Sequence, residues 1–249
     1  MSTARFSKKT LDFIRRASRQ KKAEWLDRNR DEYEAVLVEP VRHLMGEVAK
    51  ALKPIAPGYR FPARSFARIR RSGERAEEYG PFRDWIGTQA TRDSGSRYES
   101  LPNLYFHIDE EDVYSAGGLY MPSAGQTKQI RAWIAEDARA LESLLKDRKF
   151  HAVFKSLGNE RKLKTKPRDY PIDHPRIEWL KLSGFYVWRP FSKKEFFSSE
   201  FPSLLTEDWK QVLRLNSVLD GYLRTWPKVE EAREELPDIR APQVQWDED

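Results

Sequence analysis

The chain of 249 residues contains no cysteine. This absence excludes disulfide scaffolds, zinc–thiolate sites, iron–sulfur clusters and thiol nucleophiles. The chain also has no apolar run approaching 18 residues, and its first 25 positions lack the apolar stretch of a signal peptide. We therefore expect a cytoplasmic protein with no membrane partner.

The local motifs of several enzyme classes are missing as well. The sequence has no GxxxxGK loop followed by Ser or Thr, no GxGxxG after a predicted strand and no GxSxG elbow. Its four histidines show neither HExxH nor any other paired spacing, so we expect no metal site and no cofactor. Whether the protein is an enzyme stays open on these grounds.

What the chain does contain is charge of both signs. Charged residues make up 34%, with 45 Lys and Arg against 39 Asp and Glu, beside 39% hydrophobic residues. This balance is typical of a globular protein with a solvated surface. Positive charge is concentrated in residues 1–71 and 148–194, whereas residues 229–249 are acidic.

Helical periodicity dominates the beginning of the chain. Apolar residues recur at three- and four-residue intervals over residues 11–17 and 26–52, which predicts two helices in tandem. Pro40 falls inside the second pattern and lacks a backbone N–H, so we expect a kink or a split near Glu39. Residues 53–62 are rich in Pro and Gly and predict a linker into a sheet.

Two-residue alternation then predicts strands. Residues 65–71 are compatible with an arginine-rich strand, and residues 101–122 predict a hairpin around an acidic turn. Leu104, Phe106 and Ile108 share one face of this hairpin, which leaves Tyr105 and His107 on the other face. The adjacent glycines at 117 and 118 indicate a bulge or a close approach by backbone or ligand.

The second half of the chain returns to helical patterns. Ser123 can cap a helical region that continues to Gly158, residues 174–182 suit a short helix, and residues 184–190 predict a buried strand. A last helix is predicted from Thr206 to about Thr225. Together these patterns predict one α+β domain over residues 1–236, in which an N-terminal helical pair and a C-terminal helix pack on a mixed, mainly antiparallel sheet. Residues 237–249 are predicted to be an acidic flexible tail that is dispensable for folding.

Three groups of residues carry a resemblance to a known family. They are Trp25, Asn29, Tyr33 and Pro40 in the early helices, Gly117, Gly118, Tyr120, Met121 and Pro122 at the end of the hairpin, and Lys164, Pro167, Arg168, His174 and Pro175 in the basic turn. The chain resembles the mainly bacterial family named domain of unknown function 2461 from about residue 11 to residue 226. The resemblance implies an α+β fold and a shared site, but it supplies no reaction. In residues 68–85 only the first arginines and Pro81, Phe82 and Arg83 follow the family's pattern.

A basic and aromatic constellation is the strongest candidate site. Arginine forks match carboxylate or phosphate, and tyrosine hydroxyls can orient such a ligand. An imidazole titrates near neutral pH and suits a general acid or base. We therefore expect one basic cleft for a small anionic ligand, with His107 and His174 as candidate catalytic residues. The candidate binding residues are Arg70, Arg83, Tyr114, Tyr120, Lys164 and Arg168.

Three other interpretations stay open at this point. The arginines can simply pair with neighbouring acids while the tyrosines cover the sheet. The basic segments also suit a nucleic-acid-binding protein, although no nucleic-acid-binding motif is present. The acidic tail and the exposed charge suit a noncatalytic protein-interaction module. The sequence does not indicate an oligomeric state.

Overall fold

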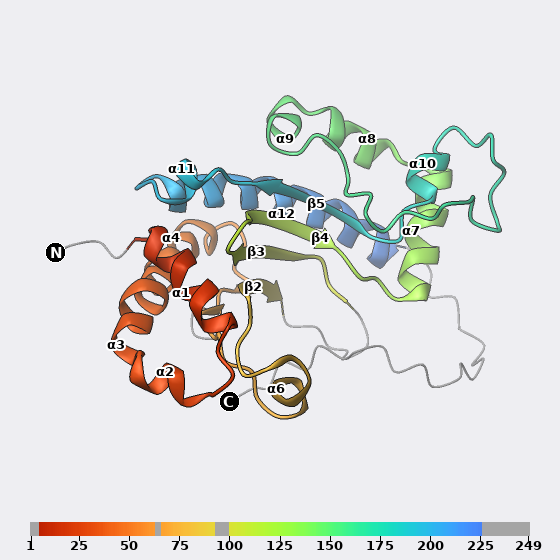
Figure 1. Cartoon of the computed structure of the whole chain (residues 1–249). Helices are drawn as coiled ribbons and strands as arrows, with labels where there is room; N and C mark the ends of the chain where they lie inside the picture. Colours follow the sequence, from red (N-terminus) through yellow and green to blue (C-terminus); the bar gives the residue numbers. More distant parts are fainter. Residues whose placement is uncertain (1–4, 63–65, 93–99, 226–249) are drawn as a thin grey trace.

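The computed structural model describes residues 5–62, 66–92 and 100–225. These residues form an α+β fold in which one antiparallel sheet is packed against helices (Figure 1). The predicted α+β class is thus confirmed, with every strand pairing antiparallel. The predicted acidic tail over residues 237–249 lies outside the described residues.

The sheet has five strands in sequential order, β1-β2-β3-β4-β5. They are β1 (Tyr59–Arg60), β2 (Trp85–Arg92), β3 (Asn103–Asp109), β4 (Val113–Leu119) and β5 (Phe185–Pro190). The predicted hairpin is confirmed as β3 and β4, with His107 opposite Tyr114. The arginine-rich strand predicted over residues 65–71 is wrong for the described part of that segment, where Arg70 forms only an isolated bridge with Phe82.

The N-terminal helices lie together at one end of the sheet (Figure 1). They are α1 (Lys8–Ser18), α2 (Glu24–Arg28), α3 (Arg30–Tyr33), a π-helical turn (Glu34–Val38) and α4 (Glu39–Leu52). The expected irregularity near Glu39 is confirmed, because the π-helical turn ends just before Pro40. Pro40 has no N–H to donate, and the carbonyl of Val36, four residues earlier, accepts a hydrogen bond of 2.8 Å from the hydroxyl of Thr10.

The helical region after the hairpin is divided rather than continuous. Its helices are α7 (Ala124–Glu136), α8 (Arg139–Lys146), α9 (Arg148–Val153) and α10 (Ile177–Leu180). Another short helix, α6 (Glu74–Tyr79), lies before the hairpin. Ser123 caps α7 as predicted, in a reciprocal pair with Gln126. The helices are interrupted at Asp137 and Asp147, because each carboxylate accepts a hydrogen bond from a backbone N–H near the start of the next helix. Arg139 donates to Asp137, and Phe150 donates to Asp147.

The C-terminal helix covers one face of the sheet. After the short helix α11 (Lys193–Phe196), α12 (Phe201–Thr225) packs across β3, β4 and β5 (Figure 1). The helix begins at Phe201 rather than at the predicted Thr206, whose hydroxyl instead donates to the carbonyl of Pro202. The predicted close approach of backbone at the glycines is confirmed, because a Cβ on Gly117 would lie 2.5 Å from the carbonyl oxygen of Asn103 and would also collide with Val212 of α12.

Candidate functional site

Strand alternation gives the sheet two different faces. On β3, Leu104, Phe106 and Ile108 are fully buried in the core, and on β4 the side chains of the same face meet α12. The opposite face, which we call the aromatic face, carries mainly large rings. Its members are Trp85 on β2, Tyr105 and His107 on β3, Tyr114 on β4, and Tyr186 and Trp188 on β5. This face therefore holds side chains that the hydrophobic core does not require.

A chain of hydrogen bonds runs along β3 on the aromatic face. The hydroxyl of Tyr105 lies 3.1 Å from His107 Nδ1, and His107 Nε2 lies 2.9 Å from a carboxylate oxygen of Asp109. The other oxygen of Asp109 accepts the backbone N–H groups of Glu111 and Asp112 in the hairpin turn. Although burial acts to raise the pKa of Asp109, these hydrogen bonds hold it below its usual range.

The ionised state of Asp109 determines the roles of the other two groups. A carboxylate can only accept, so His107 Nε2 carries a proton and donates to Asp109. In a neutral imidazole Nδ1 then accepts, and the hydroxyl of Tyr105 donates to it. We call this chain, Tyr105 to His107 to Asp109, the relay.

Two aromatic rings enclose the imidazole of the relay. Trp85 stacks on His107 with ring centroids 5.4 Å apart, and Tyr114 stacks on His107 with centroids 4.6 Å apart. The side chain of His107 is only 12% exposed as a result. The hydroxyl of Tyr105 has room over β2 because position 87 is glycine, where a Cβ would lie 2.8 Å from that oxygen.

Two tyrosines of this face are hydrogen-bond donors at neutral pH. Burial raises the pKa of Tyr105, and the neighbouring Tyr114 adds to the effect. Burial also raises the pKa of Tyr114, while a hydrogen bond with Tyr105 acts in the opposite direction. Both hydroxyls therefore stay protonated: that of Tyr105 donates to His107, and that of Tyr114 can donate a hydrogen bond to an anion.

Arg83 brings positive charge to the edge of the aromatic face. Its backbone N–H donates to the carbonyl of Ile69, and its half-buried guanidinium lies 5.4 Å from the centroid of the Trp85 ring. Burial and the neighbouring charges of Arg71 and Arg68 lower the pKa of Arg83. Across the described ranges, no carboxylate forms an ion pair with this guanidinium, which donates instead to the carbonyl of Arg68 at 3.4 Å. Arg83 is thus a half-buried cation with no counter-ion among the residues that the structure describes.

The other side of the aromatic face contains a carboxylate. Glu160 accepts a hydrogen bond of 2.8 Å from Trp188 Nε1 and another from the hydroxyl of Tyr186. Burial acts to raise the pKa of Glu160, but these bonds bring it below its usual range. The ring of Tyr120 packs against Tyr186 with centroids 4.9 Å apart, and the guanidinium of Arg161 lies over Tyr120.

The structure brings together only part of the predicted site. Arg83, His107 and Tyr114 lie around the relay, because Arg83 and His107 both contact Trp85 and His107 stacks on Tyr114. Tyr120 lies at the Glu160 side of the same face.

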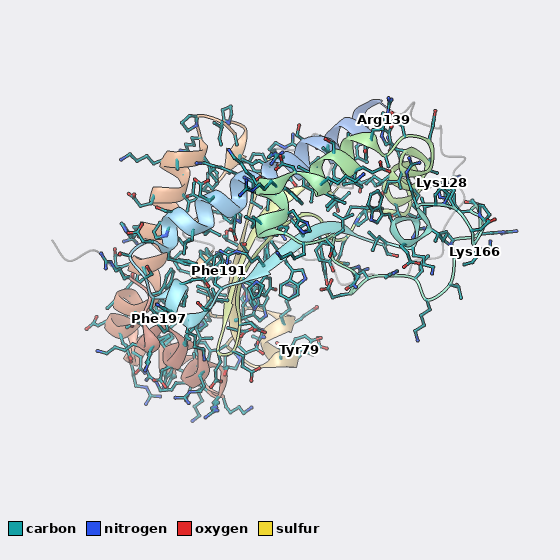
Figure 2. The ribbon with its side chains drawn as sticks, turned by 90° about the horizontal axis from the view of Figure 1, so that it is seen from above. Tyr79, Lys128, Arg139, Lys166, Phe191 and Phe197 are labelled. Atoms are coloured by element: carbon teal, nitrogen blue, oxygen red, sulfur yellow. The ribbon has the colours of Figure 1, made fainter. Side chains whose placement is uncertain are left out.

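The remaining predicted residues are placed elsewhere. The side chain of Arg70 is exposed. The arginines that lower the pKa of Arg83 are Arg71, Arg68 and Arg75, and Arg70 is not among them. Lys164 and Arg168 are exposed on a loop that Figure 2 shows projecting from the body with Lys166, away from Tyr79 of α6. His174 accepts the backbone N–H of Arg176 through Nδ1, so it fixes its own turn.

Sequence reasoning missed several members of this face. Asp109 could have been found, since it continues the alternation of Tyr105 and His107 by two residues. Trp85 was missed because β2 was not predicted, and Trp188 was expected to belong to the core although it is 45% exposed. Glu160 lies in a loop and has no local signal in the sequence.

Two hollows lie away from the aromatic face. A groove of about 610 Å³ between α8 and α12 is lined by Asp147 and Arg214, which pair with each other at 2.6 Å. A small hollow of about 60 Å³ lies around Phe6 and Phe196. Within residues 5–62, 66–92 and 100–225, no three His, Asp or Glu side chains gather as metal ligands would. In the same ranges, no helix is both long and apolar enough to cross a membrane.

The fold and this face define an α+β protein with a helix-covered core face and an aromatic, charge-bearing opposite face. Residues 9–217 match the model of a family described as conserved hypothetical protein, domain of unknown function 2461. The chain belongs to this family. No curated protein matches the chain, and no solved structure matches it either.

Proposed function

We propose that the aromatic face binds a small anionic ligand, a phosphate ester or a carboxylate, at Arg83. The observation that carries the proposal is the half-buried guanidinium, which has no carboxylate partner among the described residues. Burying a charge is costly unless an opposite charge accompanies it. An anion would complete the site by accepting from the guanidinium fork and from the protonated hydroxyl of Tyr114.

A small ligand is favoured over nucleic acid by the pairing of the N-terminal charges. Arg16 pairs with Asp12 and Glu32, and Arg42 pairs with Glu39, so these two arginines of the basic N-terminal segment are already held by its own acids. A nucleic-acid-binding surface would need such cations free for phosphates, and its affinity would fall steeply with salt. A cytoplasmic location remains part of the proposal.

One observation favours an enzyme over a passive binding module. In the relay, the hydroxyl of Tyr105 can take a proton from the bound ligand while its own proton passes to His107 Nδ1, so that no free phenolate forms, and the resulting imidazolium is stabilised by Asp109. In this second candidate function, His107 acts through Tyr105 and does not touch the ligand itself.

The anion site is tested by binding of inorganic phosphate and of acetate at constant ionic strength, followed by tryptophan fluorescence and by NMR shifts. We expect saturable binding to the native protein and a loss of about ten- to a hundredfold in Arg83→Gln, since charge-assisted hydrogen bonds are removed. Arg83→Lys keeps the charge but loses the fork, and we expect an intermediate loss.

The matched control is Arg139→Gln. The side chain of Arg139 is 85% exposed and pairs with Asp137, and Figure 2 shows it on the opposite side of the view from Tyr79 of α6. This variant should bind both anions as the native protein does. Equal binding by the native protein and by Arg83→Gln, with both folded, would reject the anion site.

A further inference from the structure

Glu160 is a second charge on the aromatic face that has no countercharge within the described ranges. Its low pKa keeps it ionised at neutral pH. In the part of the chain that the structure describes, no Lys, Arg or His side chain forms an ion pair with it. Its two hydrogen bonds come from neutral donors, Tyr186 and Trp188. The carboxylate of Glu160 is therefore held in place by hydrogen bonds, while no described cation neutralises its negative charge.

Aromatic rings surround this carboxylate. Trp188 is 45% exposed, yet its indole N–H is fixed on Glu160, so the ring is held in one orientation while remaining accessible. Tyr114 meets Trp188 edge-on with centroids 6.1 Å apart. One cation already uses this cluster, because the guanidinium of Arg161 lies 5.4 Å from the centroid of the Tyr120 ring.

Rings beside a carboxylate are the chemistry that recognises an organic cation. The ring quadrupole attracts an ammonium group placed over its face, and tryptophan is the best such platform. We propose that Trp188 and Glu160 form a subsite for an alkylammonium group. An exposed tryptophan that served only for packing would not need a charged partner to orient it.

The two charges together define the class of ligand, and this step rests on the anion site proposed above. Trp188 and Tyr105 lie in one cross-strand row with Ala116 between them, two strand spacings or about 10 Å apart. This row meets β2 at Gln89, whereas the guanidinium of Arg83 lies over Trp85, which pairs with Asp109 nearer the hairpin turn. The two subsites are therefore placed diagonally across the aromatic face. The ligand is thus dipolar, with an anionic group at Arg83 and an ammonium group at Trp188.

The cation subsite is tested with choline, without need of the natural ligand. The indole N–H resonance of Trp188 is identified as the one that disappears in Trp188→Phe. Choline is then titrated against its neutral isostere 3,3-dimethyl-1-butanol while this resonance is followed. We expect a saturable shift with choline and binding at least about threefold weaker for the neutral isostere, because only the charged compound gains the cation–π and carboxylate attraction.

Variants separate the charge from the ring. Glu160→Gln keeps an oxygen acceptor for the indole but removes the charge, so choline should lose its advantage over the isostere. Glu207→Gln, an exposed glutamate that pairs with Lys210 on α12, is the matched control and should leave the shifts unchanged. Equal affinity for choline and the isostere in the native protein, or no saturable shift, would overturn the subsite.

The outcome is independent of the phosphate and acetate experiment. If choline binds as expected but Arg83→Gln leaves anion binding unchanged, the cation subsite stands and the dipolar ligand is rejected. If anions bind at Arg83 but choline binds no more tightly than the isostere, the anion site stands and this inference is rejected.

Discussion

At the scale of single residues, the protonation of His107 is set by its neighbours. Asp109 is fixed as an acceptor by the hairpin turn, and Tyr105 is kept as a donor by the burial that raises its pKa. Between an acceptor and a donor, a neutral imidazole has only one tautomer that satisfies both. The relay thus has a defined direction.

We predict that the neutral imidazole of His107 carries its proton on Nε2. Long-range ¹H–¹⁵N NMR should show a protonated Nε2 and an accepting Nδ1 for the neutral ring of the native protein. In Asp109→Asn the backbone N–H groups of Glu111 and Asp112 hold the amide oxygen, which leaves the amide NH2 facing Nε2, so the Nε2–H tautomer should lose population. Tyr105→Phe serves as the comparison, because it keeps the contact with Asp109. An Nδ1–H tautomer in the native protein would contradict the relay as drawn.

At the scale of elements, a side chain of α1 stabilises the irregular helix that follows. The carbonyl of Val36 lies in the π-helical turn, four residues before Pro40, and Thr10 donates to it from a fully buried position. The hydroxyl of Thr10 also accepts the backbone N–H of Ser7 at the start of α1. One hydroxyl therefore joins two helical segments that are far apart in sequence.

We predict that Thr10→Val destabilises the protein by about 1 to 3 kcal/mol, because it leaves buried backbone groups without partners while keeping the shape of the side chain. Urea denaturation followed by circular dichroism measures the change. Thr10→Ser retains the hydroxyl and should lose less than Thr10→Val. If Thr10→Val were as stable as the native protein, the link to Val36 would have no energetic role.

The hairpin was predictable because its information is local. Alternation over seven residues separates Leu104, Phe106 and Ile108 from Tyr105 and His107, and the structure confirms both faces. The N-terminal helical pair and the cap at Ser123 follow from equally local patterns.

The parts that could not be predicted depend on distant contacts or on competing local bonds. β2 mixes Gly, Thr and Gln with apolar residues, and it becomes a strand because β3 pairs with it. The breaks at Asp137 and Asp147 leave the helical periodicity intact while their carboxylates compete for backbone N–H groups. Within the candidate site, a loop brings Glu160 to Trp188, and no local sequence pattern predicts the path of that loop.

At the scale of the whole molecule, hydrogen-bond and ion-pair partners set the pKa values of several carboxyl groups. Hydrogen bonds from Arg139 lower the pKa of Asp137 to about 2, and Arg214 together with the backbone of α9 lowers that of Asp147 to about 2. The pKa values of Asp12, Glu178 and Glu195 are lowered as well. Asp208 is an exception, because burial raises its pKa despite its bonds to Arg189 and Ser115.

We predict that the free energy of unfolding falls as the pH drops from about 4 to about 2. A carboxyl whose pKa is lower in the folded state binds its proton more readily when unfolded, so acid favours the unfolded chain. Asp208, whose pKa is raised in the folded protein, has the opposite effect on the free energy of unfolding and offsets only part of this loss. Denaturation curves at neutral pH and at several acidic values measure the effect. Stability that stayed constant or rose over this window would contradict the prediction.

The alternation along β3 has an evolutionary consequence. Because the same seven residues supply the core through one set of side chains and the relay through the other, deleting a single residue would exchange the two sets. Asp109 and His107 would enter the apolar core, and Phe106 would face outward. Change in length within this strand is therefore barred to descendants of the chain, and the exposed turn at residues 110–112 is constrained as well, because its backbone N–H groups hold Asp109 in place.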